Sequence, residues 1–309
     1  IIYIKMNKNI IVVNNLTKKY KITDKFALEG IDLKIRQGSI FGLLGPNGAG
    51  KSTFINILAG LVNKTSGQVK VFDLDLDTNP KTIRGNLGVV PQEINIDPFF
   101  TPMQVMNNQA GMYGIKKKNN KNLEILKNLN LDDKANAYSR SLSGGMKRRL
   151  MVAKAMVHNP PIIILDEPTA GVDVELRNKL WDYIRRLNKA GTTIILTTHY
   201  LKEAEILCDE LAVINNGKVI ACDKKKNLLS LLDEKYLILE FDNTNFKVPE
   251  KLKKYCIKKT KNSIELKFNK SENSVTNFIK IFEKTKSKIK DISTKDSDLE
   301  EIFINLLKK

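Results

Sequence analysis

Cysteine is scarce in this sequence of 309 residues. Cys208, Cys222 and Cys256 lie far apart, without the short spacings that metal-binding modules use. Their odd number and wide separation argue against a disulfide scaffold and suit a reducing cytoplasm. Since 42% of the residues are hydrophobic, the chain is expected to fold around ordinary cores, as one large domain plus a smaller one.

Long apolar runs are absent as well. The run PIIIL at 161–165 is as long as a strand, whereas a membrane-spanning helix needs roughly eighteen apolar residues or more. The opening stretch IIYIK is too short for a secretory signal. It precedes Met6, and translation starting there would leave residues 1–5 outside the protein. We therefore expect no leader and no membrane span in this sequence.

Acidic residues are outnumbered, which gives a net charge of +18 and an isoelectric point near 9.6. Such a charge ordinarily suggests nucleic acid or an anionic membrane surface as a partner. However, the lysines are accompanied by abundant asparagine and isoleucine, the pattern of an AT-rich genome. From Lys224 onward there is no arginine, the residue favoured for bidentate phosphate contacts. We do not expect a nucleic-acid partner.

What the sequence does have is a glycine-rich stretch, GPNGAGKST, between an apolar run and a segment with helical spacing. Its residues are Gly45, Pro46, Asn47, Gly48, Ala49, Gly50, Lys51, Ser52 and Thr53. The three glycines permit backbone angles that turn successive N–H groups around an anion, and the helix that follows adds its positive end. Lys51 supplies a full charge and Ser52 a hydroxyl suited to Mg²⁺. This pattern predicts a phosphate-binding loop; the competing interpretation is a turn with a solvated lysine.

The surrounding pattern favours a nucleotide fold. Residues 39–44, 86–91, 161–165, 192–198 and 210–215 read as buried strands, with a helix expected at 53–61 after the loop. Apolar strands alternating with helices predict a largely parallel, covered sheet. Residues 10–16 and 31–36 alternate like strands at a sheet edge. Residues 93–140 carry helical spacing only, and a linker is expected at 221–226, before a small α+β domain.

Two acidic residues stand where a parallel sheet places its ligands. Asp166 and Glu167 follow the apolar strand at 161–165, and Pro168 ends that strand. Asp166 can reach a Mg²⁺ bound at the glycine-rich loop, and Glu167 can deprotonate an attacking water. Adjacent acids at a strand end can also be a solvated turn, so the interpretation depends on the glycine-rich loop upstream.

The stretch SLSGGMKRRL offers a second anion site. Ser143, Gly144 and Gly145 precede a helical run, so they form a helix N-terminus with free N–H groups. A chain with a complete phosphate loop does not need a second cradle for the same nucleotide. Two cradles make sense if two copies pair head to tail, each lending its SGG to the nucleotide of the other.

Over about residues 10–220 the chain resembles the nucleotide-binding subunit of an ABC transporter. The matching motifs come in the family's order: TKKY at 17–20, GPNGAGKST at 45–53, VVPQE at 89–93, LSGGM at 142–146, ILDEP at 164–168, AGVD at 170–173 and TTHY at 197–200. The spellings LSGGMKRRL, PTAGVDVELR, THYLKEAE and DLEEIF are similar to the ABC-2 type exporters of bacteria. One departure is Met146, where the family signature most often has glutamine; we expect it only to pack under its helix.

The resemblance implies an α/β P-loop ATPase domain, with a RecA-like core, an antiparallel β-subdomain and a helical subdomain. The expected boundaries are an N-terminal extension at 1–9, the ATPase domain at 10–220 with its helical subdomain at about 93–158, and an accessory α+β domain at 221–309. ATP and Mg²⁺ are the implied ligands. The implied contacts are adenine on Tyr20; phosphates at 45–53; Mg²⁺ at Ser52, Gln92 and Asp166; catalysis by Lys51, Gln92, Glu167 and His199; and Ser143, Gly144, Gly145 and Asp173 across a homodimer.

Several of these residues also have ordinary structural interpretations. Tyr20 can be an edge-strand aromatic, and Gln92 gains meaning only from its place after a buried strand. His199 stands at a strand end, whereas His158, the other histidine, is expected only to cap a helix end.

The resemblance further implies a motor subunit at the cytoplasmic face of the inner membrane, held there by ABC-2 permease subunits on separate chains. Residues 94–101 are the expected contact with that membrane partner. Two other functions compete: an ABC ATPase acting on ribosomes or DNA, and a module whose terminal domain binds cargo such as a glycan. One phosphate loop and the absence of sustained heptads weigh against the ribosomal and DNA-repair kinds. Copurification with a multi-span membrane protein, with ribosomes or DNA, or with glycan distinguishes the three.

Overall fold

The computed structural model describes residues 9–21, 25–169, 171–230, 233–242, 246–284, 288–296 and 298–308. The expected N-terminal extension therefore lies, apart from Asn9, outside the described residues. The chain divides into two compact units between Lys225 and Lys226. No helix within the described ranges is long and apolar enough to cross a membrane.

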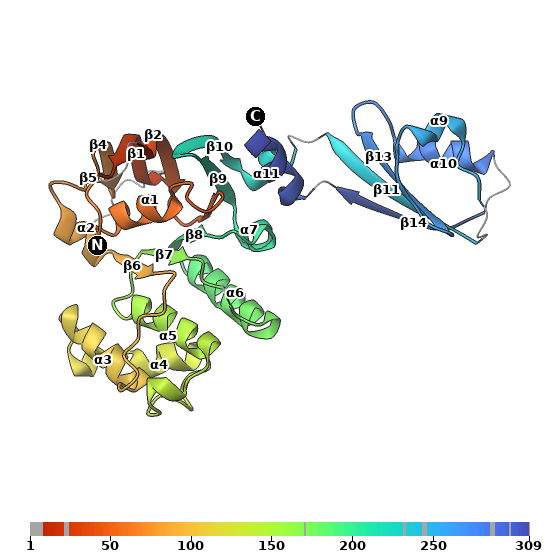
Figure 1. Cartoon of the computed structure of the whole chain (residues 1–309). Coiled ribbons are helices and arrows are strands. Elements are labelled where there is room, and N and C mark those ends of the chain that lie inside the picture. Colours follow the sequence, from red (N-terminus) through yellow and green to blue (C-terminus); the bar gives the residue numbers. More distant parts are fainter. Residues whose placement is uncertain are drawn as a thin grey trace. The chain divides into compact units, whose positions relative to one another are not determined.

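The first unit contains two sheets (Figure 1). The smaller is antiparallel, in the order β2 (Phe26–Arg36), β1 (Asn9–Lys19), β4 (Ser66–Val71) and β5 (Leu74–Asp75). The larger has the order β10 (Lys218–Lys224), β9 (Glu210–Asn215), β3 (Ile40–Leu44), β8 (Thr193–Thr197), β7 (Ile162–Asp166) and β6 (Leu87–Val90). Its strands are parallel except for the β9–β10 pair. The predicted parallel sheet is present, whereas β1 lies inside its own sheet rather than at an edge.

The two sheets share one core around α1 (Lys51–Leu58). Phe54, Ile57 and Leu58 of this helix are buried, and their cluster includes Ile11 and Val69 of the small sheet. The same cluster takes in apolar residues of the large sheet: Phe41, Leu87, Ile164, Ile195 and Ala212. Because α1 begins directly after the glycine-rich loop, packing it between two sheets fixes the position of that loop. Helix α1 begins and ends earlier than the helix that the apolar spacing predicts at 53–61.

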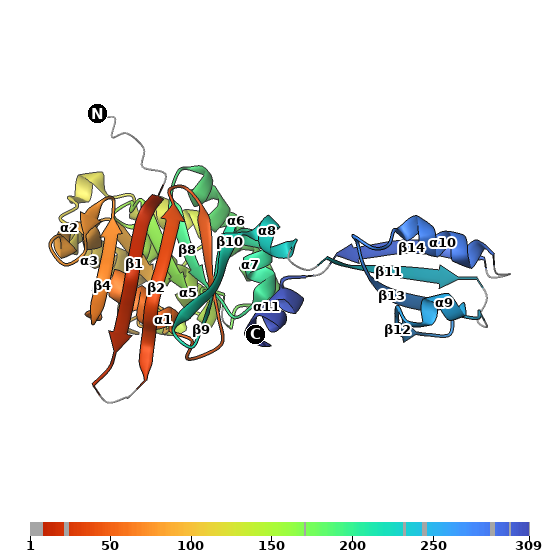
Figure 2. The ribbon, with the colours of Figure 1, turned by 90° about the horizontal axis from the view of Figure 1, so that it is seen from above.

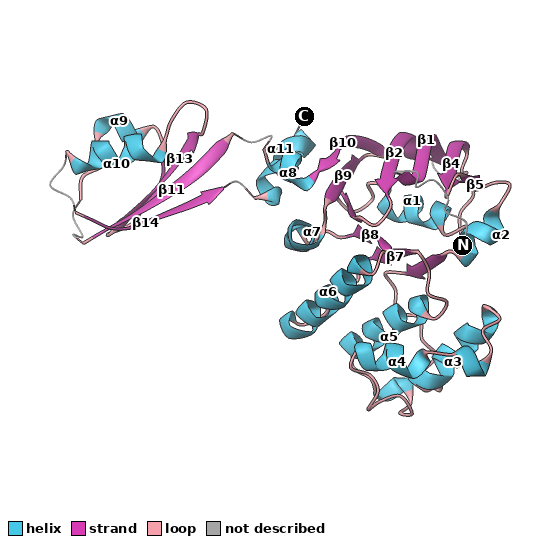
Figure 3. Ribbon diagram, turned by 180° about the vertical axis from the view of Figure 1, so that it is seen from behind, coloured by secondary structure: helices cyan, strands magenta, loops and turns pink. Residues whose placement is uncertain are grey.

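Helices complete the first unit. Around the sheets lie α2 (Pro80–Gly85), α6 (Val174–Lys189) and α7 (Leu201–Leu207). Helix α8 (Lys225–Leu229) begins at the last residue of this unit, and its other residues belong to the second unit. The segment between β6 and β7 holds α3 (Pro102–Met112), η1 (Lys117–Asn119), α4 (Asn122–Asn128), η2 (Ser139–Ser141) and α5 (Gly144–Met156). Figure 3 shows this segment as a group of helices and loops without strands, as predicted for 93–140.

The boundary between the two units falls inside the segment 221–226, where the sequence predicts a linker, but this segment has regular secondary structure. Residues 221–224 belong to β10, and α8 begins at Lys225. Its lysines indicated a loop, but β10 pairs along its length with β9, and that pairing determines the structure of this polar stretch.

The second unit is a small α+β fold with an antiparallel sheet. The strand order is β12 (Cys256–Lys259), β13 (Ser263–Asn269), β11 (Glu234–Phe241) and β14 (Ile289–Asp296). Its helices are α9 (Glu250–Lys253), α10 (Val275–Glu283) and α11 (Leu299–Lys308). Leu239 and Leu266 of the sheet pack with Phe278 and Phe282 of α10 in a core of their own.

Candidate active site

The candidate site lies at the carboxyl ends of four neighbouring strands. The strand order β3-β8-β7-β6 brings together the glycine-rich loop after β3, His199 after β8, the acidic pair at the end of β7 and Gln92 after β6. This is the edge where parallel sheets bind ligands. A pocket of about 360 Å³ opens there, lined by Ala27, Asn47, Gly48, Gly50, Lys51, Ser52, Thr53, Gln92 and Glu167.

Glu167 is held at the centre of this site. Its Oε2 accepts a hydrogen bond from Gln92 Nε2 at 3.0 Å, and its Oε1 lies 3.1 Å from His199 Nδ1. Its own N–H donates to Thr197 O and Oγ1, both at 3.1 Å. The residue is 7% exposed and its φ of 49° is in the left-handed region, which costs free energy for a non-glycine residue. This strained, anchored backbone aims the carboxylate at the pocket.

Asp166 and Lys51 flank that carboxylate. Asp166 is buried and accepts a hydrogen bond at Oδ1 from the Thr197 hydroxyl. Lys51 Nζ donates to Gly45 O at 2.8 Å and Pro46 O at 3.0 Å, so the ammonium lies along the loop. Burial lowers the pKa of Lys51, while the charges of Glu167 and Asp166 raise it. Lys51 and Glu167 therefore line a cavity of nucleotide-phosphate size, and Asp166 directly precedes Glu167 at the end of β7.

The donor set fits Mg²⁺. Mg²⁺ prefers oxygen ligands and takes most of them from phosphate and water, using one or two protein side chains. Ser52 lines the pocket with an exposed hydroxyl, and Asp166 offers a carboxylate at the same sheet edge. Gln92 uses its amide nitrogen for Glu167, so its amide oxygen can face a cation. Within the described ranges, no group of three or more His, Cys, Asp or Glu side chains forms a cage for another kind of metal.

Tyr20 lies beside the loop. Its hydroxyl is 3.5 Å from Thr53 Oγ1, its ring is 37% exposed, and Lys18 Nζ lies 4.8 Å from the ring centroid. An exposed aromatic face next to a phosphate loop can stack on a planar base. The expectation of an adenine contact is compatible with this position.

The SGG motif and Asp173 do not line the pocket. Ser143 is the N-cap of α5 and accepts a hydrogen bond from Met146 N at 3.2 Å; Gly144 begins the helix. Asp173 is the N-cap of α6 and accepts from Leu176 N at 2.9 Å. In this copy of the chain, Ser143 and Asp173 therefore cap helices and do not face the pocket of the glycine-rich loop.

Arg148 is a residue that sequence reasoning missed. It lies on α5 and is 4% exposed, and its guanidinium donates to Pro91 O at 2.9 Å and Gln92 O at 2.7 Å. Burial lowers the pKa of Arg148, while the charges of Asp166 and Glu167 act to raise it. It connects the SGG helix with the backbone of Gln92. The next residue, Arg149, is buried as well, and no pattern in the sequence indicates which of the two arginines reaches Gln92.

His158 does not cap its own helix, contrary to the prediction. Its Nε2 lies 3.1 Å from Leu87 O of β6, and its ring stacks on Tyr113 with centroids 3.7 Å apart. Burial lowers its pKa. The histidine therefore contacts the large sheet and α3, away from the site.

A buried acid supports the loops around the site. Glu203 on α7 is fully buried and its Oε1 accepts from Trp181 Nε1 at 2.8 Å. Burial raises its pKa; hydrogen bonds from Trp181, Thr198 and Thr169 act in the opposite direction. Thr198 precedes His199 and Thr169 follows Pro168, so Glu203 lies beside the two loops that carry His199 and Glu167. Its Oε2 is buried without a hydrogen-bond partner among the described residues.

We expect Glu203→Gln to change how stability depends on pH. With a raised folded-state pKa, wild type loses stability as pH rises from the ordinary value near 4.5 through the folded-state pKa. Each pKa unit corresponds to about 1.4 kcal/mol. The side chain of the variant cannot ionise at this position, so the variant does not lose this stability. The free energies of unfolding of the two proteins are compared by urea titration between pH 5 and 8. The value for the variant minus the value for wild type should increase as the pH rises. Glu205→Gln on the same helix is the solvent-accessible control, and a pH-independent difference would contradict the assignment.

Comparison with known proteins agrees with this geometry. Residues 28–170 match the family model described as ABC transporter. The linearmycin resistance ATP-binding protein LnrL of Bacillus subtilis is 33% identical over 301 residues, covering 94% of this chain and 96% of LnrL. The Nod factor export ATP-binding protein I of Ralstonia nicotianae is 39% identical over 226 residues, covering 72% and 69%.

Solved structures are similar to about 70% of this chain. A structure of an ATP-binding subunit of an ABC transporter has a TM-score of 0.65 at 27% identity, covering 72% of this chain and 92% of that chain. The ATP-binding cassette MJ0796, as a post-hydrolysis dimer bound to ADP and Pi, has a TM-score of 0.63 at 30% identity, covering 69% and 98%. The predicted fold class is confirmed.

Proposed function

This chain belongs to the ABC transporter family, as one of its ATP-binding, ATP-hydrolysing subunits, and we propose that two copies close around two ATP molecules to drive an ABC-2 type membrane exporter. The observation that carries the proposal is the position of Glu167, held between Gln92 and His199 at a phosphate-loop pocket. The permease is a separate chain, and the subunit works at the cytoplasmic face of the membrane by binding to it.

ATP binds with its adenine on Tyr20 and its phosphates along residues 45–53. The Lys51 ammonium, which here donates to two loop carbonyls, turns to the phosphates, since they carry more charge than a carbonyl. Ser52, Asp166 and Gln92 would hold Mg²⁺, which neutralises charge on the phosphates when bound.

Hydrolysis then depends on Glu167. The carboxylate accepts a proton from water as the water oxygen attacks the γ-phosphorus, and the bond from that phosphorus to the ADP oxygen breaks. His199 holds the γ-phosphate and the carboxylate in line, and Gln92 holds the other carboxylate oxygen. Burial of the acid in a site closed by a second copy excludes bulk water, which strengthens each charge contact.

The second copy supplies what the pocket does not contain. Ser143, Gly144 and Gly145 present a helix N-terminus that lines no part of the pocket of their own copy. Such a terminus binds anions. In an antiparallel dimer it closes over the γ-phosphate held by the partner, with Asp173 at the same interface.

Complementation tests this composite site. Lys51→Ala and Ser143→Arg should each abolish ATPase activity, because each dimer then has two defective sites. An equimolar mixture should recover about one quarter of wild-type activity, since half of the dimers then carry one intact site. The matched control mixes wild type with the Lys51→Ala, Ser143→Arg double variant, and thermal unfolding checks each variant. A mixture that stays inactive would contradict two half-sites per chain.

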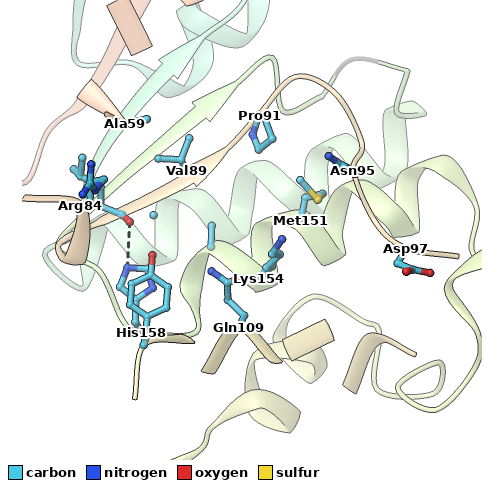
Figure 4. Close-up of a pocket in the computed structure, with 14 residues that line it drawn as sticks. Ala59, Arg84, Val89, Pro91, Asn95, Asp97, Gln109, Met151, Lys154 and His158 are labelled. Carbon is cyan, nitrogen blue, oxygen red and sulfur yellow. Dashed lines mark hydrogen bonds between the residues drawn. The ribbon is translucent and has the colours of Figure 1, made fainter. Parts of the chain in front are cut away.

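The membrane partner is proposed to dock beside Gln92. A second pocket of the first unit, of about 580 Å³, is lined by Asn95 and Asp97 from the segment after Gln92, by Gln109 of α3 and by Lys154 of α5. Figure 4 shows Asn95 and Asp97 on this segment, and His158, hydrogen-bonded to Leu87 O, elsewhere along the pocket. Polar and charged groups converge there on an opening suited to a protein segment.

Exposed apolar side chains lie on the same segment of the chain as the pocket residues Asn95 and Asp97. Ile94, Phe99 and Phe100 are 40%, 69% and 41% exposed, an unusual concentration for one short segment. Neighbouring exposed aromatics favour a protein contact. The segment 94–101 follows Gln92 closely in the chain, so a movement of this segment can shift Gln92. Because Gln92 donates a hydrogen bond to Glu167, docking of the membrane partner and hydrolysis can influence each other.

A further inference from the structure

The second unit ends its sheet with a long open strand. β14 pairs with β11 along one side, and the sheet order places it at the edge opposite β12 (Figure 2). Seven of its eight residues are exposed. Within the described part of this unit, no strand pairs with its other side. An extended edge of this length is a template for another strand.

The backbone of this edge has donors directed away from β11. Ile292 N–H donates to the carboxylate of Asp291 at 2.8 Å, on its own strand, and so does not serve β11. Since hydrogen-bonding direction alternates along an antiparallel pair, the N–H of Thr294 faces the same open side. The residue between them, Ser293, directs its own backbone groups to β11, opposite Ile238.

The sequence of this edge is complementary to itself. When KDISTKD, residues 290–296, is laid antiparallel to a copy with Ser293 opposite Ser293, Asp291 faces Lys295 and Lys290 faces Asp296. Ile292 then faces Thr294, which agrees with the direction of both N–H groups. Opposite charges directly across a sheet are favourable.

Neighbouring registers do not share this complementarity. A shift of two residues keeps the direction of the N–H groups but places Asp291 or Lys295 opposite Ser293, which removes the ion pairs. A shift of one residue does not keep the direction of the N–H groups, and it places Lys290 opposite Lys295 or Asp291 opposite Asp296. Like charges across a sheet are destabilising. Edge charges commonly guard a sheet against pairing, but on this edge they match those of a second copy in the register centred on Ser293.

We propose that β14 pairs antiparallel with β14 of a second copy, about a two-fold axis at Ser293, and so joins two four-stranded sheets into one. Two of these side chains already form ion pairs at the surface: Lys295 lies 3.0 Å from Asp298, and Asp296 lies 2.9 Å from Lys270. Each can also interact with an opposite charge on the second copy. Lys290 lies at an irregularity of β14, so its pair with Asp296 is the outermost of the register.

This pairing uses no nucleotide. It keeps two copies together after the catalytic halves open, so that reclosure around ATP becomes an intramolecular step. One strand pair is a small interface, which suits a tether between copies that also meet elsewhere. The pairing can be tested on the full chain without ATP. A negative result there would contradict the β14 pairing without bearing on the proposed ATP-dependent dimer.

Disulfide formation tests the register in the full chain. In a Cys222→Ser, Cys256→Ser background without nucleotide, Ser293→Cys should give cross-linked dimers under mild oxidation. Facing residues of a non-hydrogen-bonded pair lie about 4.5 Å apart at Cα, within the disulfide range of about 4.4–6.8 Å. Asp291→Cys and Lys295→Cys should cross-link when mixed and not alone. Lys258→Cys, on the opposite edge strand, is the control.

Charge exchange tests the same contact without cysteine. Asp291→Lys alone sets lysine against Lys295, and Lys295→Asp alone sets aspartate against Asp291. Each should raise the dimer dissociation constant in sedimentation by about tenfold or more, and a mixture of the two should restore it. Lys258→Asp should leave it unchanged. Failure of Ser293→Cys to cross-link, equal cross-linking by Lys258→Cys, or no restoration on mixing would each overturn the proposal.

Discussion

Glu167→Gln should leave ATP binding intact and lower the rate of hydrolysis by about 10²–10⁴-fold, the contribution of a positioned general base. Glutamine has nearly the shape of glutamate, so the backbone anchored to Thr197 is retained. One amide oxygen can still meet Gln92 or His199, but the amide cannot accept a proton from water. With ATP present, the variant should accumulate as a dimer because the bridging γ-phosphate is not removed.

The measurement is steady-state phosphate release together with size-exclusion chromatography at saturating ATP. Glu175→Gln is the matched control: this exposed acid pairs with Lys179 on α6, and its loss should change neither the rate nor the dimer population. Most of the wild-type rate persisting in Glu167→Gln would refute the assigned role. An inactive variant that also failed to bind ATP would instead indicate a structural role for the acid.

Much of the candidate site could be predicted because its parts follow strands. The apolar runs before Gly45, Gln92 and Asp166 indicated buried strands, and parallel strands end at one edge of a sheet. The contacts among side chains could not be predicted. That Gln92 and His199 hold the two oxygens of Glu167 depends on strand order, β3-β8-β7-β6, which no local pattern contains.

Strands formed by polar residues were missed for a related reason. In β13 every second residue of SIELKFN is buried, so this strand has the alternation that a sequence pattern can reveal. Neither β14 nor β10 has a fully buried residue, so neither shows the alternation of buried and exposed positions that marks β13. Each is a strand because a neighbour pairs with it, and β-propensity depends on that context. The same exposure that hid β14 from the sequence leaves its edge open to a second copy.

Gly50→Ala should abolish nucleotide binding. Gly50 has φ 110° and ψ −1°, directly before α1. A Cβ there would lie 2.5 Å from the backbone oxygen of Ala27 and 2.8 Å from Leu28 Cδ2. Both residues belong to β2, and Leu28 is fully buried in the core around α1, so the strand cannot retreat cheaply. The loop must deform instead and displace Lys51, at a cost of about 3 kcal/mol or more.

Gly48→Ala separates steric contact from backbone strain. Gly48 has φ 81°, but an added Cβ meets no atom within 4 Å. Its cost is conformational alone, about 1–2 kcal/mol, so ATP affinity should fall by no more than about 30-fold. For Gly50→Ala the fall should exceed about 100-fold, measured by titration with ATP alongside urea unfolding. Equal losses in the two variants would mean that β2 does not shape the loop. Unequal losses would show that the small sheet, which supplies no phosphate ligand in this scheme, sets the geometry in which Lys51 meets ATP.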